Sequence, residues 1–574
     1  MSAIDRIRRN MDFSGRTAAV SDLIRSPLAL VSPLIILLIS MFFGPMLILI
    51  LFSIQPGNDL SLNPLAWTID NYTTFVTKIV SGSGIYDVVL TTTTFISVVT
   101  VILTLVISFP AAYALARKIN RFHTTILISL ILPLLTSITI RMLGWVMFLM
   151  KDGVLASALG VLGLSYNSIL YQESTVMLGT IYVYLPFMLF PIYLSMLSIP
   201  ESVYTAASDL GASKFKIFKD IILPLTKPGI VIGSLFVFVL SLGASVESEL
   251  LGGGQTFTMA SNIKFSFGVA QDFPLGSVQA VSLLIIAGGS GVYILRNIDL
   301  ADIAQRDGSS NEYSSSPNSR VENALWYGYT LLVTLFLFLP MTAIIIASTY
   351  DGRVFAFPYE FTLEWYAQVL DNGTIRNAII NTLQIALPVT AISTAIGTAA
   401  AIGYARFSFP GRDLFKIVAL LPIFFPLLLI GLGMSLWSNA IGFGNGITQT
   451  IIAEVVWIAP IVMFVVSITA LSIDPELEDA ARDLGAGTIK LYYDVILPLI
   501  ADGVIAGAIF AFILSWNNYY IASYMSGSNI LVTTWVHSRL TQGFSSLVPA
   551  VAAVLFYISL IAAIIIIIIN HIKK

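Results

Sequence analysis

The chain contains no cysteine and only three histidines in 574 residues. Without cysteine it has no disulfides, no thiolate nucleophile and no cysteine-ligated zinc. His123, His537 and His571 are far apart in the sequence, so interfacial or tail positions explain them better than a metal site. Charged residues are also scarce, at 11%, against 57% hydrophobic residues. This composition is typical of a polytopic membrane protein with little mass outside the bilayer.

Motifs for catalysis are missing as well. The sequence contains no G-x-x-x-x-G-K-[ST] phosphate-binding loop, which excludes ATP hydrolysis by that route. No serine-hydrolase pattern occurs in a suitable context. We therefore expect no catalytic residue, no metal ion, no cofactor bound by the chain itself and no nucleic-acid partner.

Long apolar runs dominate the sequence instead. A run of about 20 apolar residues is long enough to cross the hydrocarbon core as a helix. Two sets of six such runs occur, which predicts an all-α membrane protein with about twelve transmembrane helices. The predicted spans are 29–54, 88–116, 124–149, 174–197, 229–250 and 276–295 in the first half, and 326–349, 378–405, 413–438, 449–471, 502–525 and 548–570 in the second.

Basic residues indicate which ends of the spans face the cytoplasm. Residues 1–28 carry five arginines, and further basic residues occur in 117–123, 214–227 and 406–416 and at the C-terminus. By the positive-inside rule, these connections and both termini are predicted to be cytoplasmic.

A polar, serine-rich segment divides the chain. It lacks apolar periodicity, which is typical of a flexible linker. We therefore predict a cytoplasmic tail (1–28), a first transmembrane domain (29–296), a cytoplasmic linker (297–322) and a second transmembrane domain (323–574). Because each half has an even number of predicted spans, the two halves have the same orientation rather than an inverted one.

A polar segment at 201–228 lies between two apolar runs, and residues 475–498 repeat it. Paired alanines let a short helix lie close to a partner surface, and the glycine allows a turn. A plain helix-turn-helix between two spans would use the same residues, so the pattern alone leaves docking and simple connection open. The matched residues, about 274 positions apart, are Ala206, Ala207 and Gly211 in the first copy and Ala480, Ala481 and Gly485 in the second.

The shared pattern is two alanines, three residues, a glycine, nine residues and then I/V-x-L-P. It resembles the EAA loop of permease subunits of binding-protein-dependent ABC importers. The resemblance implies two cytoplasmic coupling helices, each seated in a cleft of a P-loop ATPase subunit that binds ATP and Mg²⁺. The leading acid of the motif is Thr205 in the first copy and Asp479 in the second. Asp209 and Asp483 would hold the loop, cap the helix or meet basic residues of the ATPase.

The resemblance covers nearly the whole chain and includes the spermidine/putrescine permease pair. In the first half the resemblance rests on LPLLTSITIRMLGW (132–145), YVYLPFMLFPIY (182–193) and ELLGGGQTFTMASNIKFSF (249–267). In the second half it rests on AARDLGAG (480–487) and SWNNYYIASYMSG (515–527). It implies two permeases of the type I importer fold fused in one chain, a separate external solute-binding protein and a place in the bacterial inner membrane.

Ionisable residues inside predicted spans are candidates for a solute path, because charge is costly in lipid. On straight helices Arg141 and Glu247 would lie about 25 and 27 Å from the cytoplasmic boundary, and Glu247 would share a helix face with Gly243. Together with Trp145 and Glu249 they either pair or snorkel at the outer interface, or line the outward mouth of the path.

In the second half, Trp516, Asn517 and Asn518 are predicted at matching depth, as a core amide pair or as solute contacts. The two asparagines stand where the polyamine-type permease has acidic residues. The candidate solutes are therefore a polyamine and, as alternatives, ferric iron, a phosphonate, an opine or another small organic solute. Outside the importer class, an ion-gradient-driven carrier and a membrane scaffold remain alternatives.

Overall fold

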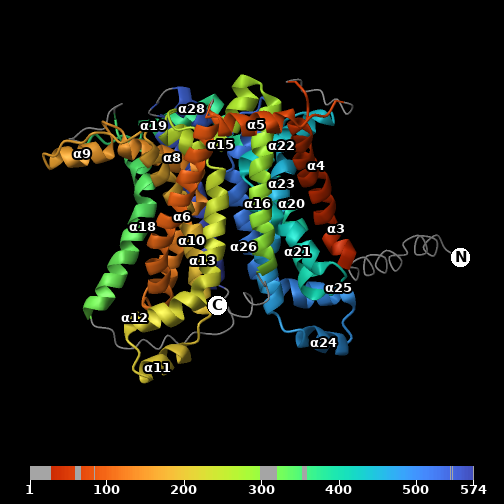
Figure 1. Cartoon of the computed structure of the whole chain (residues 1–574). Coiled ribbons are helices and arrows are strands. Elements are labelled where there is room, and N and C mark those ends of the chain that lie inside the picture. Colours follow the sequence, from red (N-terminus) through yellow and green to blue (C-terminus); the bar gives the residue numbers. More distant parts are fainter. Residues whose placement is uncertain are drawn as a thin grey trace.

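The computed structural model describes residues 27–57, 66–82, 84–297, 320–351, 359–542, 545 and 547–572. Apart from one isolated bridge between Tyr350 and Phe361, the described residues form helices, turns and irregular segments (Figure 1). The predicted all-α membrane architecture is confirmed. Most of the predicted N-terminal tail and of the predicted linker lies outside the described residues.

In the first half the helices are α3 (Pro27–Leu38), η1 (Ile39–Phe43), α4 (Gly44–Ser53), α5 (Asp70–Val80), α6 (Tyr86–Arg117), α7 (His123–Ile131), η2 (Leu132–Leu135), α8 (Ile138–Leu149), α9 (Val154–Val161), α10 (Glu173–Leu197), α11 (Glu201–Asp209), α12 (Lys214–Ile217), η3 (Phe218–Ile222), α13 (Leu223–Leu242), α14 (Val246–Leu251), α15 (Met259–Phe265), η4 (Ser266–Ala270) and α16 (Phe273–Asn297).

In the second half they are α18 (Arg320–Ser348), α19 (Glu364–Asp371), α20 (Gly373–Arg406), α21 (Arg412–Leu420), η5 (Leu421–Phe424), α22 (Leu427–Ala440), α23 (Ile447–Ser472), α24 (Glu476–Asp483), α25 (Thr488–Leu491), η6 (Tyr492–Ile496), α26 (Leu497–Trp516), α27 (Tyr520–Met525), α28 (Val532–Gln542) and α29 (Leu547–Ile572).

Ten of the described helical segments are long and apolar enough to cross a membrane, and a bent pair raises that number to 11. The sequence predicted each span as one continuous apolar helix, and that is wrong at one position in each half. The third span of each half is broken rather than continuous. In the second half, Arg412–Phe424 and Leu427–Ala440 are bent by 100° relative to each other. In the first half, 124–149 is interrupted by η2 and the extended residue Thr136.

The breaks follow from proline chemistry. Pro133 and Pro422 each lie early in a short 3₁₀ helix, where their missing N–H is tolerated. The backbone is extended directly after each of these short helices. The estimated height of Arg141 along a straight helix is therefore wrong, because α8 starts anew at Ile138.

The fifth spans also end earlier than predicted. α13 ends at Leu242 and α26 at Trp516, and the chain turns before α14 and α27 begin. Gly243 terminates α13 while Glu247 lies in α14, so the prediction that they share a helix face is wrong. The matching helix ends remain about 274 residues apart in the sequence, which supports the internal repeat.

The first helix of each half packs on the other half. α3 packs against α20 and α4 against α22; conversely, α18 packs against α8 and α6 (Figure 1). Within their own halves, α4 also packs against α16 and α18 against α29. Glycines permit this exchange. A Cβ at Gly144 of α8 would collide with the backbone of Pro340 in α18, and one at Gly433 of α22 would lie 3.0 Å from the carbonyl oxygen of Pro45 in α4.

The two ends of the bundle differ in what they present. α11, α12, α24 and α25 lie together at one end, whereas α5, α9, α19 and α28 lie at the opposite end (Figure 1). We call the first the docking end, after the role that the resemblance implies for the repeated segments, and the second the distal end.

Candidate functional site

The repeated segments form two short helices, α11 and α24, that protrude at the docking end. Each ends in the same hydrogen-bond pattern. Ala212 N–H donates to the Ala207 carbonyl at 3.0 Å and Gly211 N–H to that of Ser208 at 2.9 Å; in the second copy Ala486 N–H donates to Ala481 and Gly485 N–H to Arg482 at the same distances. This is a Schellman motif, and it places each glycine in the left-handed region, at φ +77° and +84°. The motif glycines thus have a backbone role.

A leucine precedes each of these glycines. Leu210 and Leu484 are 89% and 90% exposed, at matched positions of the two helices. The motif alanines divide: Ala206 and Ala480 are exposed, while Ala207 and Ala481 are half-buried against the protein. Neither leucine was among the site residues predicted from the sequence.

The motif acids are at the surface. Asp209 and Asp483 are the last residues of α11 and α24, so they do not cap the helix N-termini. No hydrogen bond or ion pair joins the carboxylate of either to another described residue. A carboxylate at a helix C-terminus is unfavourable with respect to the helix dipole. Thr205 bonds back to its own helix, at the carbonyls of Glu201 and Ser202.

The two halves meet where a broken third span faces the end of a fifth span. Ser137 N–H, freed at the break before α8, donates to Oδ1 of Asn517 at 3.1 Å. Asn517 in turn donates from Nδ2 to the Ile513 carbonyl and to Ser559 of α29. At the matched place a Cβ on Gly243 would lie 2.7 Å from Cβ of Pro426. Asn517 is therefore an interdomain contact.

Arg141 and Glu247 lie in the interior of the first half, near that meeting point. They are 8% and 0% exposed, so neither snorkels to a surface. Glu247 Oε1 accepts a hydrogen bond from Tyr184 at 3.0 Å. Arg141 interacts electrostatically with Glu247 and with Tyr520 of the second half. The structure thus brings these two predicted residues into one polar interior cluster.

The other predicted path residues have mixed surroundings. Trp145 packs among Phe148, Tyr182 and Phe336, and Trp516 stacks on Phe512 with 6.0 Å between ring centroids. Both indoles are buried. Asn518 is buried too, and its Oδ1 accepts from the backbone N–H of Ile521, across the turn into α27. Their part in a solute path stays a prediction.

Sequence reasoning missed Glu454. This acid lies in the span α23, is almost fully buried and accepts a hydrogen bond from Ser515 of α26. The signal was available, because an ionisable residue inside a predicted span is a default functional candidate.

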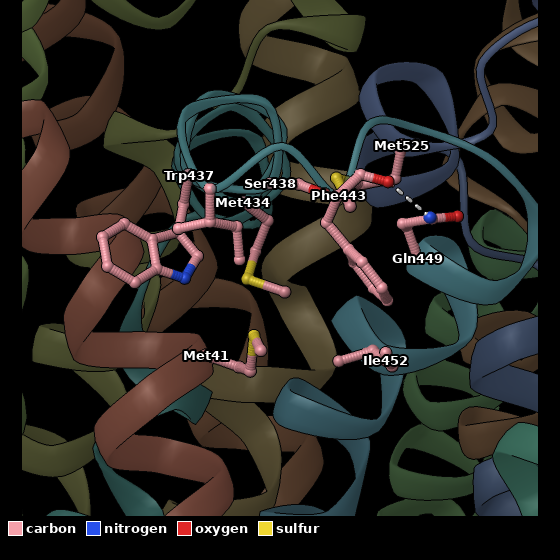
Figure 2. A pocket seen from close by; sticks show the side chains of 9 residues that line it. Met41, Met434, Trp437, Ser438, Phe443, Gln449, Ile452 and Met525 are labelled. Carbon is pink, nitrogen blue, oxygen red and sulfur yellow. Dashed lines mark hydrogen bonds between the residues drawn. The ribbon is translucent and has the colours of Figure 1, made fainter.

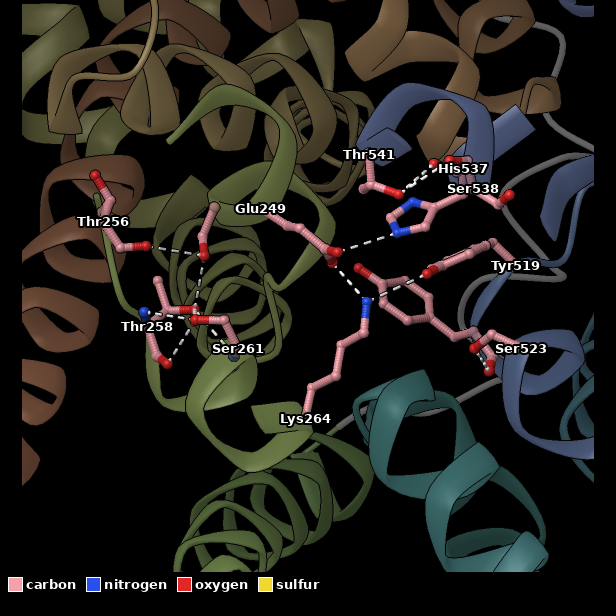
Figure 3. Close-up of polar contacts among 12 residues, drawn as sticks. Glu249, Thr256, Thr258, Ser261, Lys264, Tyr519, Ser523, His537, Ser538 and Thr541 are labelled. Carbon is pink, nitrogen blue, oxygen red and sulfur yellow. Dashed lines mark hydrogen bonds and ion pairs between the residues drawn. The ribbon is translucent and has the colours of Figure 1, made fainter. Parts of the chain in front are cut away.

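Glu249 belongs to a different cluster, at the distal end and beyond the end of α13 (Figure 3). Its Oε2 lies 2.6 Å from Lys264 Nζ of α15, and its Oε1 lies 3.2 Å from His537 Nε2 of α28. The Lys264 ammonium also contacts the hydroxyl of Tyr519, at 3.4 Å. Glu249 and Lys264 come from the first half, whereas His537 and Tyr519 come from the second.

Local structure and charge fix this cluster. A capping box between Thr258 and Ser261 sets the start of α15 one turn before Lys264. Burial opposes ionisation of Glu249, but hydrogen bonds and charge from His537 and Lys264 lower the pKa of its carboxyl to about 2. Burial, followed by the neighbouring carboxylate, raises the pKa of Tyr519. Near neutral pH the ionised Glu249 thus pairs with Lys264 of its own half, and the pair contacts His537 and Tyr519 of the other half.

A small pocket lies where the first helix meets the second half (Figure 2). Met41 of η1 faces Met434 and Trp437 of α22, with Met525 of α27 and Phe443 nearby. Its lining carries no ionisable side chain, so we assign it to packing of the exchanged helix. Among the described residues, no group of three or more His, Asp or Glu side chains could hold a metal ion.

Residues 83–299 and 393–574 match the family described as "Binding-protein-dependent transport system inner membrane component". The chain belongs to this family. The two matches confirm the prediction of two tandem permease domains, and each begins after the exchanged first helix of its half. This chain is therefore a fused permease of the binding-protein-dependent family.

Relatives in the family support the fusion. Over 253 residues the permease is 33% identical to the spermidine/putrescine transport system permease protein PotB of Escherichia coli K12, covering 90% of that protein but 44% of this chain. It is 32% identical over 218 residues to the inner membrane ABC transporter permease protein YdcU of the same strain, covering 69% of that protein and 33% of this chain. It is 30% identical over 204 residues to the putrescine transport system permease protein PotI of that strain, covering 73% of that protein and 34% of this chain. All three relatives are named as permease proteins.

Proposed function

We propose that the chain supplies two transmembrane domains of an ATP-driven importer in the bacterial cytoplasmic membrane. α11 and α24 each dock one copy of a P-loop ATPase subunit, which binds ATP and Mg²⁺. A solute-binding protein delivers the solute at the distal end. The docking end and both chain termini are then cytoplasmic, and the distal end is external.

The observation that carries this proposal is the matched pair of exposed leucines on protruding helices. Leu210 and Leu484 stand at the same position before the same Schellman glycine and are almost fully exposed. A simple connection between spans has no need of such an apolar surface. Burying each leucine in a partner would contribute about 1.5–3 kcal/mol, which favours docking.

For the solute we propose a polyamine or a similar organic cation. Several relatives are named for spermidine and putrescine transport. Glu247, Glu249 and Glu454 supply carboxylates in or near the interior, which suit ammonium groups. Arg141 in the same interior favours the alternative of an anionic solute such as a phosphonate or an opine.

The test is to tag the full-length chain, extract it in mild detergent from its native membrane and identify the proteins that co-purify. We expect a P-loop ATPase at two copies per chain. In membrane vesicles, labelled spermidine uptake should require ATP and should persist with ionophores. No ATPase, together with uptake that ionophores abolish, would establish the ion-gradient carrier instead.

A further inference from the structure

The second span of the first half holds the docking helix through one side chain. Arg117 is the last residue of α6, and its side chain is only 14% exposed. Its Nη2 donates to the carbonyls of Met196 and Ile199, and its Nη1 donates to Glu201 of α11 at 2.9 Å. The guanidinium also lies over the ring of Tyr204, 4.4 Å from the centroid.

The second half repeats this arrangement. Arg406 is the last residue of α20, and its side chain is 7% exposed. Its Nη1 donates to the Ile473 carbonyl at 3.0 Å, and its Nε forms an ion pair with Glu478 of α24 at 2.9 Å. By the repeat, Ile473 corresponds to Ile199 and Glu478 to Tyr204.

The contacts of Arg117 and Arg406 share a geometry but involve different partner side chains. In each half, an arginine at the end of the second span donates to the carbonyl just before the docking helix and pairs with a side chain of that helix. The first half uses Glu201 and Tyr204, whereas the second has Pro475 at the position of Glu201 and uses Glu478 alone. Different residues thus make the same connection, which indicates that the connection itself matters.

An arginine suits this place for two reasons. Its charge is favourable at a helix C-terminus. Its planar group can donate to a carbonyl and to a second partner at the same time, which a lysine ammonium on a flexible stem does less rigidly.

We propose that Arg117 and Arg406 are positioning residues that transmit movement of the docked ATPases to the second spans. Each docking helix is already joined by the chain to the fourth and fifth spans. The arginine adds the second span, and α6 and α20 pack along α10 and α23 respectively. A displacement of α11 or α24 therefore moves three spans of its half together.

This inference rests on the proposed function, so the test separates the two. The chain is co-purified with its ATPase and reconstituted into vesicles, and ATP hydrolysis and labelled spermidine uptake are measured together. Unmodified protein that binds no ATPase, or takes up nothing while hydrolysing ATP, would count against the proposed function. The inference itself is read only from the variants.

We expect Arg117→Ala and Arg406→Ala to retain ATPase binding and hydrolysis, while spermidine taken up per ATP falls by about tenfold, as for coupling between sites of this kind. Arg412→Ala is the matched control. Arg412 lies at the same end, donates to the Tyr404 carbonyl and lies 4.6 Å from the Tyr404 ring, but contacts no docking helix. It should leave the uptake per ATP unchanged.

A further pair of variants distinguishes loss of coupling from misfolding, by copying the partner residues of the first half into the second. Glu478→Ala removes the carboxylate partner, whereas the double variant Pro475→Glu with Glu478→Tyr copies the arrangement of the first half. We expect the single variant to lower uptake per ATP and the double variant to restore it. The proposal would be overturned if Arg117→Ala and Arg406→Ala both left the uptake per ATP unchanged. It would also be overturned if both variants lost ATPase binding.

Discussion

The backbone N–H of Ser137 donates to the side chain of Asn517 at 3.1 Å, across the boundary between the two halves. The donor is free because the third span breaks just before α8, and the acceptor is in place because the fifth span ends there. The matched contact, Gly243 against Pro426, has neither a donor nor an acceptor side chain. These two matched contacts thus differ, because one is hydrogen-bonded and the other is only packed.

Asn517→Leu should therefore destabilise the joined halves. It leaves the buried Ser137 N–H without this acceptor and removes the bond to Ser559, at a cost of about 1–3 kcal/mol. Thermal unfolding in detergent would measure the loss. Asn439→Leu is the control, because Asn439 is exposed and bonds only to the Ser435 carbonyl of its own helix. Equal melting shifts for both variants would contradict this account.

The exchanged first helices give a graded prediction. A methyl group at Gly144 would collide with the Pro340 backbone, while one at Gly433 would meet the Pro45 carbonyl oxygen at 3.0 Å, and one at Gly160 would meet nothing. Overpacking costs about 1–3 kcal/mol. The melting temperature should fall most for Gly144→Ala, less for Gly433→Ala and not at all for Gly160→Ala. A different order would show that the helices do not approach as closely as described.

The periodicity of the sequence predicted the helices more reliably than their interruptions. The runs 124–149 and 413–438 are apolar on both sides of the breaks at Pro133 and Pro422, so hydropathy alone could not reveal them. Proline inside a helix did not mark a break in every case, since α6 continues through Pro110 and α20 through Pro388. What distinguishes the breaks is the local turn that follows.

The candidate site divides in the same way. The two short helices α11 and α24 were predictable because their sequence pattern is local and is repeated within one short segment. The contacts between the halves were not, because Glu249 and His537 lie 288 positions apart and nothing in either neighbourhood indicates the other. The exchange of first helices was likewise hidden, since an apolar helix carries no mark of which half it packs against.

The cluster at the distal end predicts a pH dependence. The folded-state pKa of Glu249, about 2, lies below its unfolded value near 4.5. The stabilisation is therefore fully present above about pH 4.5 and is lost as the pH falls toward 2; it amounts to on the order of 3 kcal/mol. Glu249→Gln should therefore lower the melting temperature at pH 7.

The difference between the unmodified protein and Glu249→Gln should then shrink as the pH is lowered from 4.5. Lys264→Met and His537→Gln each remove one partner of the same carboxylate and should have smaller effects at pH 7. A difference that grows on acidification would show that Glu249 does not stabilise the fold as a carboxylate.

The docking glycines allow a test that separates backbone conformation from bulk. No described atom lies within 4 Å of a Cβ placed on Gly211 or Gly485, so a Cβ there would clash with nothing. Their positive φ is the constraint: valine is strained in that conformation, whereas asparagine adopts it readily. We expect Gly211→Val with Gly485→Val to undo both Schellman turns at a cost of about 1–2 kcal/mol each, and so to uncouple ATP hydrolysis from uptake while the protein stays in the membrane. The pair Gly211→Asn with Gly485→Asn should keep both activities. If the asparagine pair fails as completely as the valine pair, the glycines are required for close contact with the partner rather than for the turn.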